Sequence, residues 1–162
     1  MTEPATFAFR PRFRGLAFGS IGVGGGIAAL AATASFATLP LATGLLGVAL
    51  GVAYLASPTW KIVVTADDTG LTVKSRDRLR FQLAWADVVR VVASPTTRTC
   101  FVDGGAPERS LLVPGDGAPA SYDIINRAAL VEAILAHVAK DKISIVSSLD
   151  AAAAEAAAKS GD

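Results

Sequence analysis

A long run of apolar and small residues without charge occupies positions 15–60 of the chain. Between Arg14 and Lys61 the sequence contains no Asp, Glu, Lys, Arg or His. A bilayer core of about 30 Å requires roughly 20 apolar residues per helix, so this run is long enough for two crossings. The pattern therefore predicts a membrane α-hairpin of two transmembrane helices over residues 15–57. Its spans are 15–37 and 41–57, with a break at 38–40.

A cleaved signal peptide is the alternative interpretation of the first span. A basic stretch precedes it, and Ala32-Thr33-Ala34 loosely resembles a small-residue cleavage site. However, the apolar stretch is longer than the usual core of a signal peptide, and a second apolar segment follows within a few residues. The sequence therefore favours an uncleaved hairpin.

The basic residues that flank the hairpin predict its orientation. Arg10, Arg12 and Arg14 precede the first span, Lys61 follows the second, and the turn at 35–40 carries no charge. The positive-inside rule then places both termini in the cytoplasm, with 1–14 as a basic cytoplasmic segment. Aromatic side chains that favour a membrane interface lie near the same ends, at Phe13, Phe18, Tyr54 and Trp60.

Glycines stand four apart along the spans, at Gly15 and Gly19, Gly22 and Gly26, and Gly47 and Gly51. Small residues on one helical face let helices approach closely in lipid. The simpler interpretation is that the two helices of one hairpin pack on each other through these residues; the other is that the glycines also drive oligomerisation. No ionisable residue lies within the spans, so the sequence offers no proton relay or ion path.

From residue 58 to 146 the pattern changes to short alternating runs separated by turns, which predicts a water-soluble domain of strands. One amphipathic helix follows, capped by Asn126, with an apolar stripe from Leu130 to Val138. The segment 143–146 is a short extension, and 147–162 is an alanine-rich tail. The seven expected strands are 60–65, 71–76, 79–83, 88–92, 99–102, 110–113 and 122–125.

Residues 62–138 resemble a bacterial pleckstrin-homology-like (PH-like) domain. The resemblance is carried by Thr69-Gly70-Leu71-Thr72-Val73, by Leu83-Ala84-Trp85-Ala86-Asp87-Val88, and by the closing helix. It implies an α+β domain built as a seven-stranded antiparallel partial barrel capped by the C-terminal helix. Bacterial members often follow membrane spans, which implies a place in the cytoplasmic (inner) membrane. The family is one of binding or assembly modules, so the resemblance implies no catalysis and no cofactor.

Four cations recur at every second position, which in a strand places side chains on one face. They are Lys74, Arg76, Arg78 and Arg80, and only Asp77 offsets them. Beside an anionic leaflet each cation adds on the order of 1 kcal/mol of attraction, so the row is a candidate contact for lipid or an acidic partner. The alternative is a solvated face whose long cations deter edge pairing.

The remaining polar residues predict no catalytic or metal site. His137 is the single histidine, so no second histidine can join it at a metal site. Cys100, the single cysteine, is expected to be a small buried hydrophobic residue, and a lone thiol suits a reducing compartment. Asp67 and Asp68 precede Thr69-Gly70 and fit a turn, while Trp85 fits a core anchor. A net charge of +1 gives no case for nucleic-acid binding.

The sequence thus predicts a non-catalytic module on the cytoplasmic face of a bacterial membrane. Its expected partners are the bilayer, with weak anionic-lipid contact, and either a protein or a second copy of the chain. The alternative is an accessory subunit of a transporter or other membrane complex, in which the hairpin itself is the working part.

Overall fold

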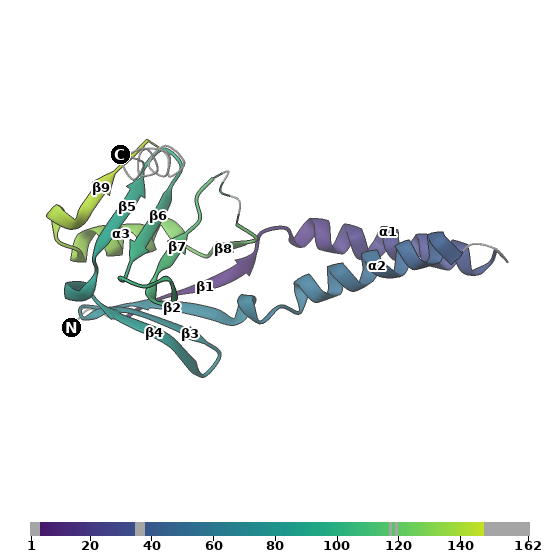
Figure 1. Cartoon of the computed structure of the whole chain (residues 1–162), viewed down its shortest axis with the longest axis horizontal. Coiled ribbons are helices and arrows are strands. Elements are labelled where there is room, and N and C mark those ends of the chain that lie inside the picture. The colour runs from purple at the N-terminus through teal and green to yellow at the C-terminus, as the bar shows by residue number, and fades with distance from the viewer. Residues whose placement is uncertain (1–3, 35–37, 117, 119, 148–162) are drawn as a thin grey trace, which may run out of the picture. The chain divides into compact units, whose positions relative to one another are not determined.

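A computed structural model describes residues 4–34, 38–116, 118 and 120–147, and the chain divides into two compact units. Pro11–Trp60 forms one, here called the helical unit. Met1–Arg10 and Lys61–Asp162 together form the other, the sheet unit. The helical unit is therefore an insertion between two pieces of sequence that belong to one folded domain (Figure 1).

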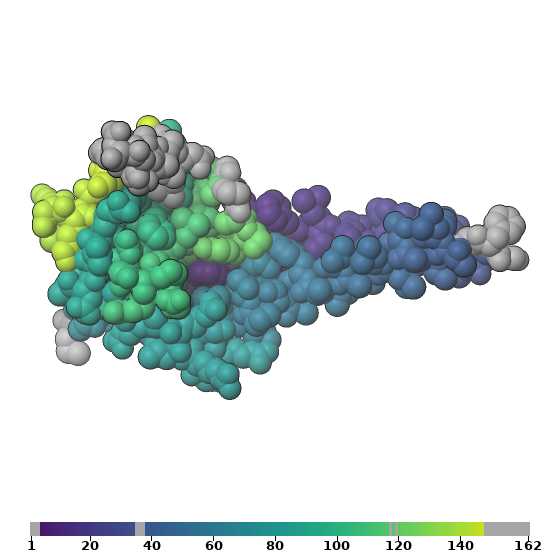
Figure 2. All heavy atoms as spheres, viewed as in Figure 1, coloured from purple at the N-terminus to yellow at the C-terminus, as the bar shows by residue number. Residues whose placement is uncertain are grey.

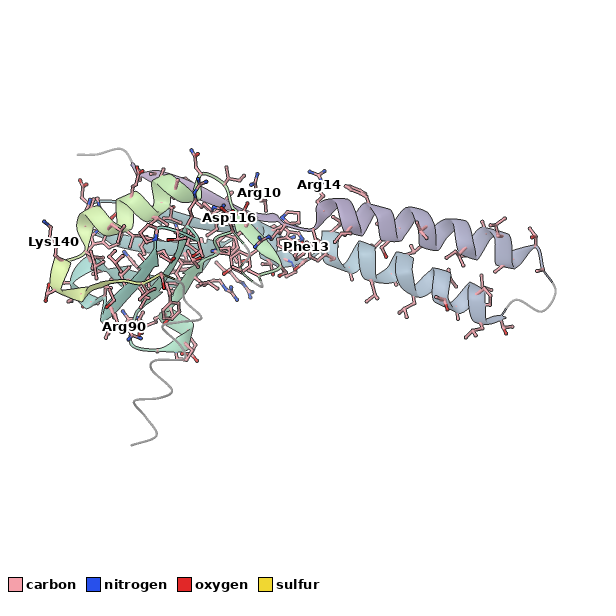
Figure 3. All side chains as sticks on the ribbon, turned by 90° about the horizontal axis from the view of Figure 1, so that it is seen from above. Arg10, Phe13, Arg14, Arg90, Asp116 and Lys140 are labelled. Atoms are coloured by element: carbon pink, nitrogen blue, oxygen red, sulfur yellow. The ribbon has the colours of Figure 1, made fainter. Side chains whose placement is uncertain are left out.

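The helical unit consists of α1 (Arg14–Ala32) and α2 (Thr38–Leu55). Both helices are long and apolar enough to cross a membrane. At a rise of 1.5 Å per residue, each is about 27–29 Å long, close to the thickness of a hydrocarbon core. The two run beside each other as a hairpin (Figure 3).

The second helix begins earlier than its sequence predicts. Residues 38–40 were expected to separate the two helices, but Thr38 starts α2 and Pro40 lies in its first turn. Proline is tolerated there because the amides of the first turn have no acceptor within the helix. Residues 35–37 of the predicted outer turn lie outside the described residues.

The sheet unit begins with a strand that the sequence pattern did not predict. Residues 1–14 were expected to be only a basic segment, yet Ala5–Pro11 forms β1, which pairs antiparallel with β2 (Ile62–Ala66). Ala8 lies opposite Val63, and Ala5 opposite Ala66. Phe7 and Phe9 alternate with smaller residues and are buried, which is the signal that identifies the strand. The hairpin thus separates two strands that are neighbours in space.

Two sheets make up this unit. The first has five strands in the order β4-β3-β2-β1-β8, and the second has four in the order β7-β6-β5-β9. All pairs with a described register are antiparallel except β5 with β9. The remaining strands are β3 (Gly70–Ser75), β4 (Arg78–Ala84), β5 (Arg90–Ser94), β6 (Thr99–Asp103), β7 (Leu111–Val113), β8 (Tyr122–Ile124) and β9 (Ile143–Ile145).

The α+β class predicted from the sequence is correct, but the seven-stranded antiparallel barrel is not. The described residues form nine strands in two sheets without barrel closure, and β9 is parallel to β5. β9 is positioned by Lys142, whose Nζ donates to the carbonyl oxygens of Ala86 and Val88 at 2.8 and 2.7 Å. A contact between residues more than fifty positions apart leaves no periodic pattern in the local sequence, so β9 could not be predicted from it. The predicted tail lies, from residue 148 onward, outside the described residues.

One helix and four short 3₁₀ turns complete the fold; the first of these turns lies at the junction of the two units along the chain. α3 (Arg127–His137) contributes Leu130, Ile134 and the following Val138 to a core shared by both sheets. The predicted side-chain cap at Asn126 is not made; its backbone instead adopts a left-handed conformation with φ 59°. Asparagine tolerates this conformation better than most residues. The 3₁₀ turns are η1 (Pro58–Lys61), η2 (Trp85–Asp87), η3 (Pro107–Arg109) and η4 (Lys140–Lys142).

Candidate functional site

The four predicted cations lie on the β3–β4 hairpin, whose tip projects at the lower edge of the sheet unit (Figures 1 and 2). All four are exposed. They do not share one strand face, however, because Arg76 sits in the turn at φ 53°. The pairing also shifts register: Val73 lies opposite Phe81 but Lys74 opposite Leu79, which leaves Arg80 as an extra residue. The cations are therefore spread around the tip rather than along one stripe.

Within the described residues, none of these four cations forms an ion pair. Three other arginines of the sheet unit do, namely Arg10, Arg109 and Arg127. The hairpin tip carries these four cations against one carboxylate, Asp77, and therefore presents net positive charge. β4 is the edge strand of its sheet, so these cations also fit the alternative of a solvated edge whose charge deters strand pairing.

A large apolar side chain stands among the charges. Leu79 lies between Arg78 and Arg80 and is 55% exposed. The next residues of the same strand, Phe81 and Leu83, turn into the core instead. The tip, defined here as residues 74–80, thus combines cations with an apolar residue that the domain does not bury. Charge counting alone did not single out Leu79.

Register places this tip at the end of the sheet where the helical unit joins. Ser75 lies opposite Ile62, the first residue of β2, and the Arg76 amide donates to the Lys61 carbonyl oxygen at 3.0 Å. A polypeptide chain extends by at most about 3.6 Å per residue, so the six residues from Leu55, the last residue of α2, to Lys61 span at most about 22 Å. Within the sheet unit, the tip therefore lies at the end of β2 that the short segment 56–61 links to α2 along the chain.

A recess and a groove lie beside the tip. Arg80 and Phe81 line one side of a recess of about 330 Å³, and Pro107, Glu108 and Ser110 line the other. Pro107 and Ser110 also line a groove of about 570 Å³. The groove runs over the outward-facing side chains of β6, β7 and β8, namely Phe101, Leu112 and Tyr122. This surface was not predicted, because it depends on three strands and η3 coming together.

A charge network ties β1 to β8 and α3. Arg10 Nη2 donates to Asp123 Oδ2 at 2.6 Å, and Arg127 Nη1 to Asp123 Oδ1 at 3.3 Å. Arg127 also pairs with Asp116; Arg10 and Asp116 lie at the same end of the sheet unit (Figure 3). Burial raises the pKa of Asp123. The hydrogen bond and positive charge of Arg10, the hydrogen bond from the Ile124 amide and the charge of Arg127 have the larger combined effect, so the pKa of Asp123 is lowered. Arg10 thus holds β1 in place as well as flanking the first helix.

The turn at Asp67 is built as predicted. Its carboxylate accepts hydrogen bonds from the amides of Thr69 and Gly70 at 2.8 and 3.0 Å. The Thr69 hydroxyl, followed by these amides, lowers the pKa of Asp67. Trp85 Nε1 donates to the Asp67 carbonyl oxygen at 2.8 Å, and its ring stacks on His137 with centroids 5.1 Å apart. Trp85 is therefore a buried anchor of this turn.

Cys100 lies in the core, as its sequence context predicts. It is 0% exposed, and burial raises the pKa of its thiol to about 12. Within the described part of the chain, no three His, Cys, Asp or Glu residues come close enough to hold a metal ion. His137 approaches Asp68 only as a pair, at 3.8 Å.

The glycines of the helical unit fall into two sets. Gly51 packs against α1, where an added Cβ would lie 2.8 Å from the Ala17 carbonyl oxygen, and Gly47 accepts a 2.8 Å hydrogen bond from Ser20 Oγ. The closest approach joins Gly24 and Gly44, neither of which belongs to the predicted set. Gly15, Gly19, Gly22 and Gly26 have no atom within 4 Å of an added Cβ.

Aromatic residues close the open end of the same hairpin. Tyr54 Oη accepts a hydrogen bond from the Phe13 amide at 3.0 Å, and its ring meets that of Trp60 edge-on, with centroids 5.0 Å apart. Arg14 lies over the Phe18 ring, 5.5 Å from its centroid. These residues gather where the sequence places a membrane interface, and they fix the start of α1 to the end of α2.

Comparison of the chain with protein-family models, curated proteins and solved structures finds no match in any of the three. The site must therefore be interpreted from its own geometry. The sheet unit offers an exposed cationic tip with a recess and a groove beside it, and the helical unit is a hairpin of two apolar helices.

Proposed function

We propose that this protein is a membrane-anchored binding or assembly module without catalytic activity. In this proposal α1 and α2 span the cytoplasmic membrane of a bacterium, and the sheet unit lies in the cytoplasm with both termini. The observation that carries the proposal is the pairing of β1 with β2 around the apolar hairpin.

That pairing constrains the topology. Paired strands lie about 4.8 Å apart, so both ends of an inserted hairpin must leave the same side of the bilayer. An open sheet has edge groups that hydrocarbon cannot satisfy, which keeps the sheet unit in water. Arg12 and Arg14 at one end and Lys61 at the other favour the cytoplasmic side.

The groove over Phe101 and Leu112 supports a protein partner. It is lined by apolar and aromatic side chains with Asp103 and Ser110 at its polar points, a composition typical of interaction surfaces. The PH-like resemblance stays a prediction, and the two open sheets with a parallel β9 do not add support to it. Self-association is the second candidate, supported by the glycines of α1 that do not pack against α2.

Site-specific photocrosslinking in native membranes tests which part binds. A photoreactive residue at Phe101 is expected to capture one protein partner, whereas the same residue at Thr72, on a different sheet, is expected to capture none. If capture occurs only from a helix position such as Leu46, which is 58% exposed, the hairpin is the working part and the accessory-subunit alternative replaces this proposal.

A further inference from the structure

We propose that the β3–β4 tip, residues 74–80, docks on anionic lipid headgroups, with Leu79 entering the interfacial layer and the surrounding cations contacting phosphates. This inference rests on the proposed membrane placement and goes beyond it, because it assigns a second, regulated membrane contact to the sheet unit. The ligand is the anionic surface of the bilayer in which the hairpin is anchored.

The chemistry of the tip matches such a surface. Arg76, Arg78 and Arg80 are exposed and, among the described residues, without an ion-pair partner, so no intramolecular pair must break on docking. Arginine forms bidentate hydrogen bonds with phosphate. Peripheral membrane segments combine such cations with exposed apolar residues that enter the headgroup boundary, which is the place of Leu79 here.

Tethering makes this weak site effective. The negative potential of a leaflet decays within a Debye length, about 8 Å at physiological ionic strength, so a free domain seldom experiences it. The Lys61–Arg76 backbone hydrogen bond keeps the tip beside the strand that follows α2. The tip therefore stays within reach of the bilayer, and docking has a small additional entropic cost.

Docking at the tip has a consequence for the recess. Arg80 belongs to both, since it lines the recess together with Pro107 and Glu108. An anionic surface that holds Arg80 withdraws this side chain from the recess wall. Lipid composition would then influence what binds in the recess and the adjoining groove.

Fluorescence depth measurements on the full chain in nanodiscs test the proposal. An environment-sensitive dye at Leu79→Cys is expected to be quenched by headgroup-level spin labels in discs containing phosphatidylglycerol, and much less in discs of phosphatidylcholine alone. Cys100 does not compete for the dye because it is fully buried. A second dye at Leu46→Cys reports insertion of the hairpin and is expected to be quenched by tail-level labels in both kinds of disc.

The chain offers a charge-matched control. Arg76→Gln/Arg78→Gln/Arg80→Gln and Arg90→Gln/Arg98→Gln/Lys140→Gln each remove three exposed cations, and each set includes one arginine at positive φ, 53° at Arg76 and 54° at Arg98. Arg90 lies in β5 and Lys140 in η4, both outside the β3–β4 hairpin; Figure 3 labels the two residues. The first variant should reduce the ratio of docked to undocked domain on the order of a hundredfold, and the second should leave it unchanged.

The outcomes separate the two proposals. Equal quenching at residue 79 in both lipids, or equal behaviour of the two triple variants, would overturn tip docking. If the Leu46 dye is quenched in those same samples, the membrane placement stands. Absence of quenching at Leu46 would overturn the membrane placement, and tip docking with it.

Discussion

The Phe7→Ala/Phe9→Ala variant is expected to lose the folded sheet unit, although both residues precede the first apolar helix. β1 is an interior strand between β2 and β8, and the two side chains are only 4% and 8% exposed. Phe9 also stacks on Tyr122 with ring centroids 4.6 Å apart. A buried Phe→Ala change costs about 3–5 kcal/mol, and a domain of this size has about 5–15 kcal/mol of stability in total.

The measurement is chemical unfolding of a soluble form of the sheet unit. Residues 12–59 are replaced by Asn-Gly, since a two-residue turn of this type joins antiparallel strands and Ala8 already lies opposite Val63. This form is expected to fold and unfold cooperatively. Thr6→Ala, an exposed change on the same strand, is the control and should shift stability by less than about 0.5 kcal/mol. Unfolding curves that coincide for the control and the double variant would show that β1 is dispensable.

Gly24→Leu/Gly44→Leu is expected to separate the two helices. A Cβ at Gly44 would lie 2.6 Å from the Gly24 carbonyl oxygen and 2.7 Å from the Ala28 amide nitrogen, and neither backbone can yield without moving a helix. Overpacking in a tight interface costs about 1–3 kcal/mol per site and occasionally more. Thermal unfolding of the full chain in detergent, followed by helical circular dichroism, should show a clear drop in Tm.

Gly22→Leu is the matched control, because an added Cβ there meets no atom within 4 Å. Its Tm is expected to equal that of the unmodified chain. A drop in Tm as large as that of the double variant would contradict the packing through Gly24 and Gly44. The same variant tests oligomerisation: if the outward glycines of α1 contact a second copy, Gly22→Leu should lower the oligomeric state.

Local patterns predicted most elements of this chain because their physical causes are local. The run without charge yielded both helices, and alternation yielded β3 to β8 within two residues. β1 was missed although Phe7 and Phe9 alternate with smaller residues, because the run is short and its partner β2 follows only after a hairpin of about fifty residues; β9 was missed because three residues carry no periodicity. Pairing across such distances is set by tertiary packing rather than by the segment itself.

The candidate site was predictable only in part, for the same reason. The spacing of Lys74, Arg76, Arg78 and Arg80 identified the cations, but the turn and the register shift decide where they point. The four-residue glycine spacing identified Gly47 and Gly51 but missed Gly24 and Gly44. Small residues occur on several faces of each helix, and only packing against the partner helix decides which face forms the contact. Leu79 stood out only once its exposure was known.

Cysteine labelling of spheroplasts tests most directly the central claim that one folded domain holds both ends of a membrane hairpin on the cytoplasmic side. Native Cys100 is silent because it is fully buried and its pKa is raised to about 12. An impermeant maleimide is expected to label Thr38→Cys, at the start of α2, in intact spheroplasts, and to label Arg98→Cys, in the sheet unit, only after permeabilisation. Labelling of Arg98→Cys in intact spheroplasts, or protection of Thr38→Cys there, would contradict the account.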